Sequence, residues 1–167
     1  KILAKINKGI TSEQSRNAAK MLRKSGIHWS AYFLIGLLGE TKKDMYTTLD
    51  FMYELKPHLA LLGVYESFPG TGMFDEGIEK NMVRTSMSLD DFYSTPPHLY
   101  YFKNPRVRSD QLEEDDFIQV VKDIKEKFHH YNKKPRNVIK TAMAKASVYR
   151  REPKILMADI RKYFRYI

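Results

Sequence analysis

The 167-residue sequence contains no cysteine. This absence excludes disulfide bonds within the chain, and it excludes zinc or iron–sulfur sites held by cysteines of this chain. The sequence also lacks an apolar run near the roughly 20 residues that span a bilayer, and its start lacks a signal-peptide pattern. Because 43% of the residues are hydrophobic and 29% are charged, we expect a globular protein. The absence of cysteine fits a location in the cytoplasm.

Acidic residues are scarce at the C-terminal end. Residues 133–167 hold 11 Lys and Arg against 2 Asp and Glu, a net charge of +9, whereas residues 1–75 carry +3 and residues 76–132 carry −3. The sequence thus predicts three regions: an α/β portion over 1–75, an aromatic linker with a helix over 76–132, and a basic helical tail over 133–167. Because the first residue is Lys1 and not Met, we expect a segment of a longer polypeptide.

The first helix is predicted over residues 12–24. Thr11 and Gln14 have the spacing of a capping box, in which each side chain bonds the other residue's backbone N–H. Ala18, Ala19 and Leu22 share the face expected to pack inward, and Gly26 suits the left-handed position after the helix.

Residues 28–65 are predicted to form a β-α-β unit. The first strand, 28–35, has a continuously apolar end, which predicts a parallel strand covered on both faces. Thr41 caps a helix that Pro57 stops, and the second strand is 59–65. The helix carries an apolar stripe made of Met45, Leu49, Met52 and Leu55. Since two parallel strands are too few for a stable sheet, we expect further strands from upstream sequence or from another chain.

The pattern is weaker from about 73 to 108. A short helix is one interpretation of residues 73–79, and the aromatic segments around Pro96 and Pro97 fit either extended strands or irregular packing. After residue 108, Ser109 or Asp110 is expected to start a helix, and Pro135 and Pro153 to open two more. The expected inward residues of these helices are Phe117, Val121, Ile124, Phe128, Ile139, Ala142, Met143, Ala146, Leu156, Ile160 and Tyr163.

A glycine-containing turn over 36–40 joins the first strand to the helix capped by Thr41. In a purely structural interpretation, Gly36 and Gly39 allow close packing and Glu40 complements the positive end of the helix dipole. The carboxyl ends of parallel strands are also where α/β sheets and barrels bind ligands, so the turn is a candidate ligand site. Its spacing differs from that of a phosphate-binding loop.

Four short motifs occur in the order found in the radical SAM superfamily; they lie at 1–11, 26–27, 33–41 and 68–71. The chain most resembles the cobalamin-binding-domain subgroup, which includes anaerobic magnesium-protoporphyrin IX monomethyl ester oxidative cyclases. The resemblance covers residues 1–75 and extends loosely to about 135. The chain has Leu38 where the usual family turn has proline, which would stiffen the turn.

The resemblance implies an α/β fold: the C-terminal part of a partial (β/α)6 TIM-like barrel, followed by an α-helical extension. Family members bind S-adenosylmethionine over a [4Fe-4S] cluster held by a C-x-x-x-C-x-x-C loop, and they generate a 5′-deoxyadenosyl radical that abstracts hydrogen from substrate. The upstream half of the same polypeptide would hold the cluster and any cobalamin. That half and a small-molecule substrate are the implied partners, and the chain alone would be inactive.

The same resemblance implies that two strand ends form the adenosyl side of the S-adenosylmethionine pocket. The backbone after the first strand would lie near the adenine, and residues after the second strand would line the same mouth. The implied cofactor-binding residues are Ile35, Gly36, Leu37, Gly39, Tyr65, Glu66 and Ser67. Glu66 is either a solvated or arginine-paired rim residue or a contact to substrate or ribose. The resemblance assigns no catalytic residue.

The five histidines have no pair at the i, i+4 spacing of a helical metal site, so no metal site is predicted within the chain. His129 and His130 instead suit the negative end of a helix dipole.

The basic tail over 133–167 has three interpretations. It forms amphipathic helices with solvated basic faces, or a helical binding module for nucleic acid, or one for an anionic membrane surface. Nucleic acid is the less favoured partner, because no base-reading or RNA-binding motif is present.

Overall fold

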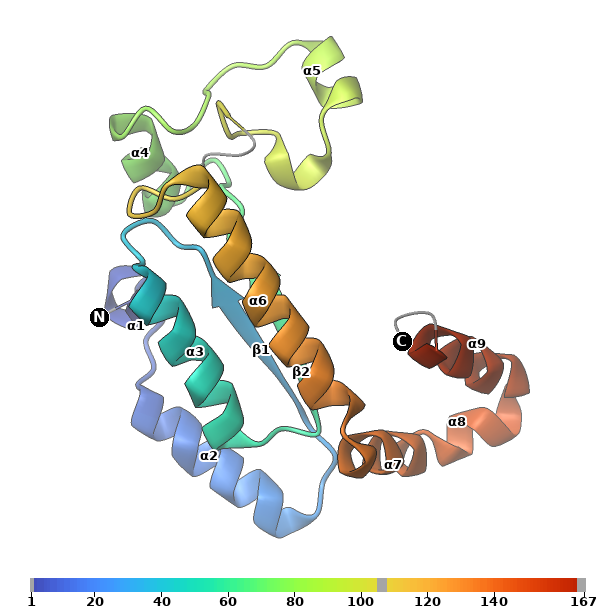
Figure 1. The fold of residues 1–167 in the computed structure, drawn as a ribbon. Coiled ribbons are helices and arrows are strands. Elements are labelled where there is room, and N and C mark those ends of the chain that lie inside the picture. The colour runs from blue at the N-terminus through green and yellow to red at the C-terminus, as the bar shows by residue number, and fades with distance from the viewer. Residues whose placement is uncertain (1, 105–107, 165–167) are drawn as a thin grey trace.

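The computed structural model describes residues 2–104 and 108–164, with side chains up to Arg161. Figure 1 shows a small sheet with helices packed on it, a lobe at one end of the strands and a helical tail at the other. The elements are α1 (Ile2–Lys5), α2 (Ser12–Ser25), β1 (Ser30–Ile35), α3 (Lys42–Leu55), β2 (Leu59–Val64), α4 (Gly72–Glu79), α5 (Leu89–Ser94), the 3-10 turn η1 (Pro97–Leu99), α6 (Glu114–Lys133), α7 (Pro135–Ala144), α8 (Ala146–Arg151) and α9 (Pro153–Phe164).

The two predicted caps are present. The Thr11 and Thr41 hydroxyls accept hydrogen bonds from the N–H groups of Gln14 and Asp44, whose side chains accept in return from the capping residues' N–H groups. Gly26 ends α2 with a φ of 71°, as predicted. On α2, Ala19 is buried but Ala18 is exposed, so the predicted inward face is only partly right.

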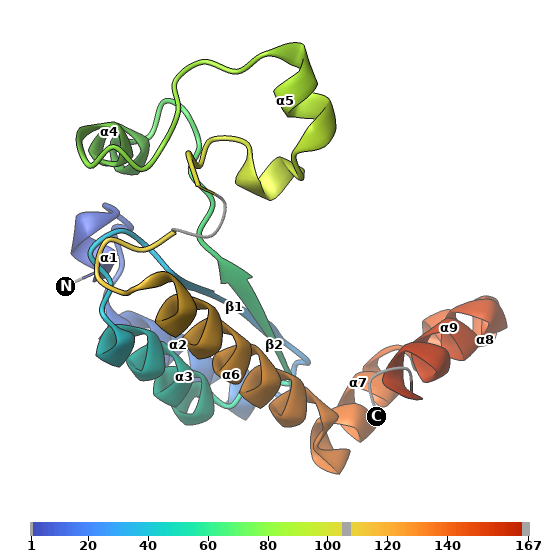
Figure 2. The same cartoon turned by 45° about the horizontal axis from the view of Figure 1, so that its top comes forward.

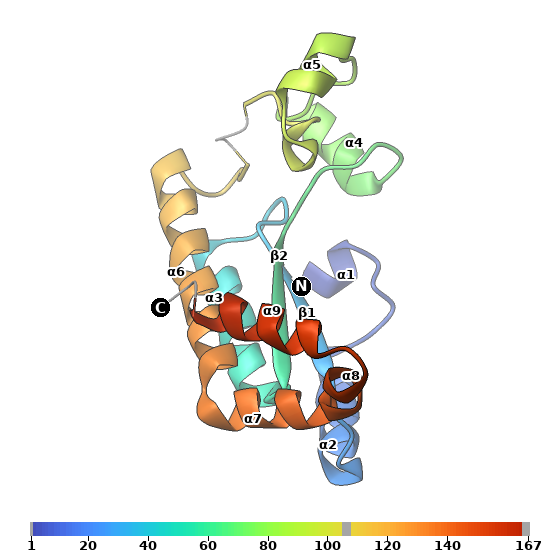
Figure 3. The same cartoon turned by 90° about the vertical axis from the view of Figure 1, so that its right-hand side faces the viewer.

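β1 and β2 pair in parallel, with Ser30 opposite Leu59 and Ile35 opposite Val64. Helices α3 and α6 cover one face of this pair (Figure 3). The core there combines strand residues with the stripes of both helices; its buried members are Ala19, Phe33, Ile35, Met45, Leu49, Met52, Leu55, Ala60, Phe117, Val120, Ile124, Phe128 and Tyr131. All four residues of the stripe predicted for α3 are therefore buried.

The opposite face of the sheet is open, so the prediction that both faces of the first strand are covered is wrong for the described chain. Tyr32 is 83% exposed and Leu34 is 42% exposed. Successive side chains of a strand point to opposite faces, and α3 and α6 lie against only the face that holds Phe33 and Ile35. The fold is mixed α/β, as predicted, and the larger barrel stays a prediction.

A lobe built on residues 72–104 lies beyond the carboxyl ends of the strands (Figure 2). A second apolar cluster packs the lobe against the strand ends, and its buried residues are Leu37, Leu38, Tyr65, Phe74, Val83 and Phe102. Helix α4 confirms the short helix expected over 73–79. In the aromatic segments, α5 and the 3-10 turn η1 form instead of strands, and the extended pairing there is one antiparallel bridge between Val83 and Phe102.

The helix expected at Ser109 or Asp110 begins at Glu114 instead. The Ser109 hydroxyl accepts from the N–H groups of Gln111 and Leu112, which makes a side-chain-stabilised turn before the helix. Of the predicted stripe, Phe117, Ile124 and Phe128 are buried and Val121 is half-buried; Val120 and Tyr131 are buried as well.

Helices α7, α8 and α9 leave the sheet at the amino ends of the strands. Pro135 and Pro153 open α7 and α9 as predicted. The predicted inward faces are wrong: the buried residue of α7 is Asn137, and the residues expected inside are exposed, namely Ile139, Ala142, Met143, Ala146, Leu156 and Ile160. The side chain of Tyr163 lies outside the described residues, as do residues 165–167.

No helix of the described chain is both long enough and apolar enough to cross a membrane.

Candidate ligand site at the carboxyl ends of the strands

The ends of β1 and β2 lie side by side. The Tyr65 N–H donates to the carbonyl oxygen of Ile35 at 2.8 Å, which continues the strand pairing by one residue. Gly36 and Leu37 follow Ile35 directly and are buried. The structure thus brings together Ile35, Gly36, Leu37 and Tyr65, four of the seven residues that the resemblance implies.

Glu40 organises the turn from within. One oxygen of its carboxylate accepts hydrogen bonds from the N–H groups of Gly36 (2.6 Å) and Leu37 (3.0 Å). The side chain is 1% exposed. Burial raises the pKa of the Glu40 carboxyl, and the two backbone N–H groups partly oppose this effect. The N–H groups of Gly36 and Leu37 are therefore already used inside the protein.

The backbone conformation at positions 36 and 39 requires glycine. Their φ angles are 81° and 79°, in the left-handed region that side chains disfavour. A Cβ on Gly36 would also lie 3.1 Å from the ring of Phe117 and 3.3 Å from Val64. A Cβ on Gly39 would lie 2.8 Å from the Lys5 ammonium.

Three other segments hold the turn from outside. The Lys5 ammonium donates to the carbonyl oxygen of Leu38 at 2.7 Å and to Glu76 at 2.8 Å. The Gly39 N–H donates to the Asp110 carboxylate at 2.6 Å. Lys80 pairs with both Asp110 and Glu76, which links Lys5 and Asp110 into one network through α4. The hydrogen bonds of Lys5 and Lys80 lower the pKa of the Glu76 carboxyl.

The side chains after β2 alternate in direction. Tyr65 and Ser67 are buried, and the Tyr65 hydroxyl donates to Ser67 at 3.4 Å, beside the cluster of the α4 lobe. Glu66 is half-buried. Arg108 donates to the Tyr65 carbonyl oxygen at 2.9 Å, and burial lowers the pKa of its guanidinium while the charge of Glu66 opposes this. The charge of Glu66 therefore acts on a nearby arginine, and both expected roles of Glu66 stay predictions.

The sequence did not predict three of the interactions that hold the turn. The carboxylate of Glu40 was expected to act on the helix dipole, but it bonds two turn amides. Lys5 and Asp110 reach the turn from 33 and 71 residues away. The sequence showed only that Glu40 directly precedes the capping residue Thr41, because an anchor at such distances leaves no local pattern.

A second cluster lies at the amino ends of the strands. The rings of His28 and His58 stack with centroids 4.9 Å apart. His28 contacts the Thr141 hydroxyl at 3.1 Å, and Lys140 contacts His58 at 3.3 Å. Burial, then the positive charges of Lys140 and Lys145, lower the pKa of His28. Burial and neighbouring positive groups likewise lower that of His58.

Across the described ranges, no three histidine, aspartate or glutamate side chains gather in a way that could hold a metal ion.

Three curated proteins are similar to parts of the chain. An uncharacterised methyltransferase of Pyrococcus horikoshii is 34% identical over 85 residues, 51% of this chain. An anaerobic magnesium-protoporphyrin IX monomethyl ester cyclase of Rubrivivax gelatinosus is 26% identical over 116 residues, 70% of this chain. A tRNA-2-methylthio-N(6)-dimethylallyladenosine synthase of Ehrlichia ruminantium is 40% identical over 73 residues, 42% of this chain. These similarities support the radical SAM superfamily.

The matches cover 18%, 19% and 16% of the three relatives, so the chain spans less than a fifth of their lengths. No family model matches the chain, and no solved structure matches it significantly. A cyclase and a methylthio synthase match with similar strength, so the similarity supports a radical SAM enzyme without selecting the cobalamin subgroup.

Proposed function

We propose that this chain is a segment of a radical SAM iron–sulfur oxidoreductase and forms the adenosyl side of its S-adenosylmethionine pocket. The observation that carries the proposal is the turn at Gly36–Glu40, which lies at the carboxyl end of a parallel strand and directly beside the end of the next one. Sequence similarity to radical SAM enzymes supports the same assignment.

The open sheet face supports a barrel in the longer protein. In a β/α barrel, helices cover the outside of the strands and the other strand face points into the barrel. Here α3 and α6 cover one face, while Tyr32 and Leu34 stand exposed on the other. The upstream half of the polypeptide would supply the missing strands, and Tyr32 and Leu34 would then face the barrel interior.

The pocket wall would be mostly backbone. Since Glu40 occupies the N–H groups of Gly36 and Leu37, adenine would meet the peptide surface of Ile35, Gly36 and Leu37 and not those two donors. Gly39 would keep the turn in shape. Tyr65 and Ser67 would support the wall from behind, since both are buried, and half-buried Glu66 would contact ribose or substrate.

The cofactors fit the chain only in part. The turn suits the adenosyl group, whereas a [4Fe-4S] cluster needs cysteines and this chain has none. The cluster ligands and any cobalamin would belong to the upstream half, and the chain alone would be inactive. Bound S-adenosylmethionine would be the source of the radical chemistry, once a reduced cluster supplies the one electron that cleaves it.

For the parent enzyme, we propose a magnesium-protoporphyrin IX monomethyl ester oxidative cyclase or a related cobalamin-dependent radical enzyme. The similarity to the Rubrivivax gelatinosus cyclase, which reaches over 70% of this chain, favours it. The similarities to a methyltransferase and a methylthio synthase make these the alternative reaction types.

The test begins with the native reading frame upstream of Lys1, where we expect a C-x-x-x-C-x-x-C motif within roughly 150–400 residues, the length of an upstream half-barrel with a further domain. The full polypeptide, with its cluster reconstituted, should release 5′-deoxyadenosine from S-adenosylmethionine under reducing conditions. Absence of the cysteine motif overturns the proposal.

The turn itself is tested with two glycine variants of that full polypeptide. Gly36→Ala should weaken S-adenosylmethionine binding at least tenfold, because a Cβ there displaces the wall, while Gly70→Ala should bind normally. Both glycines have a φ near 80°, but only Gly36 has neighbours within 4 Å of an added Cβ. Equal binding by the two variants would remove the turn from the pocket.

A further inference from the structure

Helix α7 turns its apolar residues away from the protein. Its buried residue is Asn137, and Thr141 on the same face meets His28. On the other side, Ile139 is 58% exposed and Met143 is 71% exposed. An ordinary surface helix has the reverse pattern, with its apolar stripe against the core. The exposed stripe therefore lacks its packing partner within the described part of the chain.

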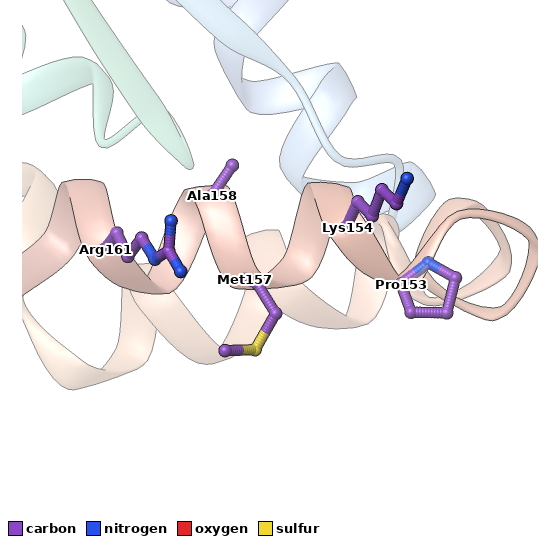
Figure 4. Close-up of a pocket in the computed structure, with 5 residues that line it drawn as sticks. All are labelled: Pro153, Lys154, Met157, Ala158 and Arg161. Carbon is purple, nitrogen blue, oxygen red and sulfur yellow. The ribbon is translucent and has the colours of Figure 1, made fainter.

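Helix α9 also exposes apolar residues. Ile155 and Asp159 are its half-buried residues, and Asp159 bonds Lys145 and Tyr149 of the preceding segment at 2.8 Å. The outward side carries Met157, which is 53% exposed. Figure 4 shows Met157 between Lys154 and Arg161 along the helix, where these residues line a shallow pocket.

Positive charge accompanies both exposed stripes. Arg136 lies one turn before Ile139 on α7, and Lys154 and Arg161 flank Met157 on α9. Among the ion pairs of the described residues, none includes Arg136, Lys154 or Arg161. With a net charge of +9 over residues 133–167, the tail offers apolar side chains bordered by cations.

We propose that the outward faces of α7 and α9 bind the surface of an anionic lipid bilayer. Helices that lie in a membrane interface bury an apolar face at the headgroup boundary and place Lys and Arg against anionic headgroups. A nucleic acid would use the cations but not the exposed Ile139, Met143 and Met157, since it is bound through phosphates and through stacking on aromatic rings. This inference is independent of the radical SAM assignment.

The test is flotation of the whole 167-residue chain with unilamellar vesicles. Vesicles of phosphatidylcholine with 30% phosphatidylglycerol should carry the chain, and vesicles of phosphatidylcholine alone should carry it at least tenfold less. Charge reversal by Arg136→Glu should lower the partition coefficient about fivefold or more, since each cation near such a surface contributes on the order of 1 kcal/mol. Raising the salt concentration should weaken binding.

The apolar part is tested by Met143→Asp combined with Met157→Asp, which should lower partition at least tenfold. Met21→Asp is the matched control, because Met21 is also a helical methionine, 70% exposed, and lies outside the tail on α2. It should bind like the unmodified chain. Circular dichroism melting of each variant checks that the fold is retained.

Each remaining outcome overturns the proposal. These outcomes are failure to float with anionic vesicles, equal flotation with neutral vesicles, and equal loss by Met21→Asp and the tail variant. Duplex DNA and single-stranded RNA are titrated in parallel. Binding to either that is tight, salt-sensitive and unaffected by Met143→Asp with Met157→Asp, without flotation, would assign the tail to nucleic acid instead.

Discussion

The two ends of the sheet are built in opposite ways. At the carboxyl ends of the strands, the turn over 36–40 is buried and is bonded by Lys5, Glu40 and Asp110. At the amino ends, α7 to α9 meet the body at few points and turn apolar residues to solvent. The comparison shows that similar helical patterns in the sequence become internal packing only where another part of the chain covers them.

We expect the largest difference in stability between the two regions when a methionine in each is replaced by alanine. Met45 follows the turn on α3 and is fully buried, so Met45→Ala should lower the free energy of unfolding by about 4 kcal/mol through lost burial and a cavity. Met143→Ala in the tail should change it by less than about 0.5 kcal/mol. Urea unfolding of the 167-residue chain measures both, and a similar loss in the two variants would show that the tail packs as a core.

The next comparison is between a buried and an exposed carboxylate and their effects on stability. Glu40→Ala leaves two buried N–H groups without an acceptor and should cost about 3 kcal/mol. Glu152→Ala, at an exposed position between α8 and α9, should cost less than about 0.5 kcal/mol. Urea unfolding again gives the numbers, and Glu40→Gln should recover part of the loss because its side-chain oxygen still accepts. A neutral effect of Glu40→Ala would mean that the turn is not held from within.

Two glycines separate crowding from backbone strain. Gly70→Ala should lower the free energy of unfolding by about 1 kcal/mol, because only its left-handed φ is unfavourable. Gly36→Ala also crowds Phe117 and Val64, so it should lower this free energy by about 2.5 kcal/mol in total. Thermal melting of both variants is the measurement. Equal shifts would show that Phe117 moves aside at no cost, which would make the turn less tightly packed than the structure indicates.

The smallest effect is a pH dependence of opposite sign at the two ends. The pKa of Glu40 is raised from 4.5, so its contribution to stability is present at low pH and is lost as pH rises through the folded-state pKa. The pKa values of His28 and His58 are lowered from 6.5, so their contribution is present above pH 6.5 and is lost as pH falls through the folded-state values.

Urea unfolding from pH 4 to pH 8 separates these contributions when each variant is subtracted from the unmodified chain. The difference to Glu40→Gln should shrink toward high pH, and the difference to His58→Gln should shrink toward low pH. The positive groups that lower the pKa values of the two histidines are Lys140, Lys145 and Arg136. Their neutral hydrogen-bond partners are the Thr141 hydroxyl and the Trp29 N–H. Parallel trends for the two variants would contradict the assigned environments.

Local signals in the sequence predicted much of the fold. The capping boxes at Thr11 and Thr41, the left-handed Gly26 and the stripe from Met45 to Leu55 all depend on neighbours within a turn or two, and the structure confirms them. The predicted parallel β-α-β unit is also confirmed.

The remainder depended on distant contacts. Asp110 suits a helix start by residue type, but it bonds Gly39 and Lys80. Tyr32 and Ile139 have apolar patterns typical of buried faces, yet the described chain supplies nothing to cover them. For the candidate site, the motif order identified the turn, whereas Lys5, Glu40 and Asp110 became visible as its supports only in three dimensions.

The anchors of the turn also set an order of assembly. Each anchor joins residues far apart along the chain: 33 residues separate Lys5 from Leu38, and 71 separate Gly39 from Asp110. Closing such loops costs entropy before any bond forms, so the capped helices and the paired strands must first bring these segments near. We therefore expect the turn to be completed late in folding, after both flanking regions have docked.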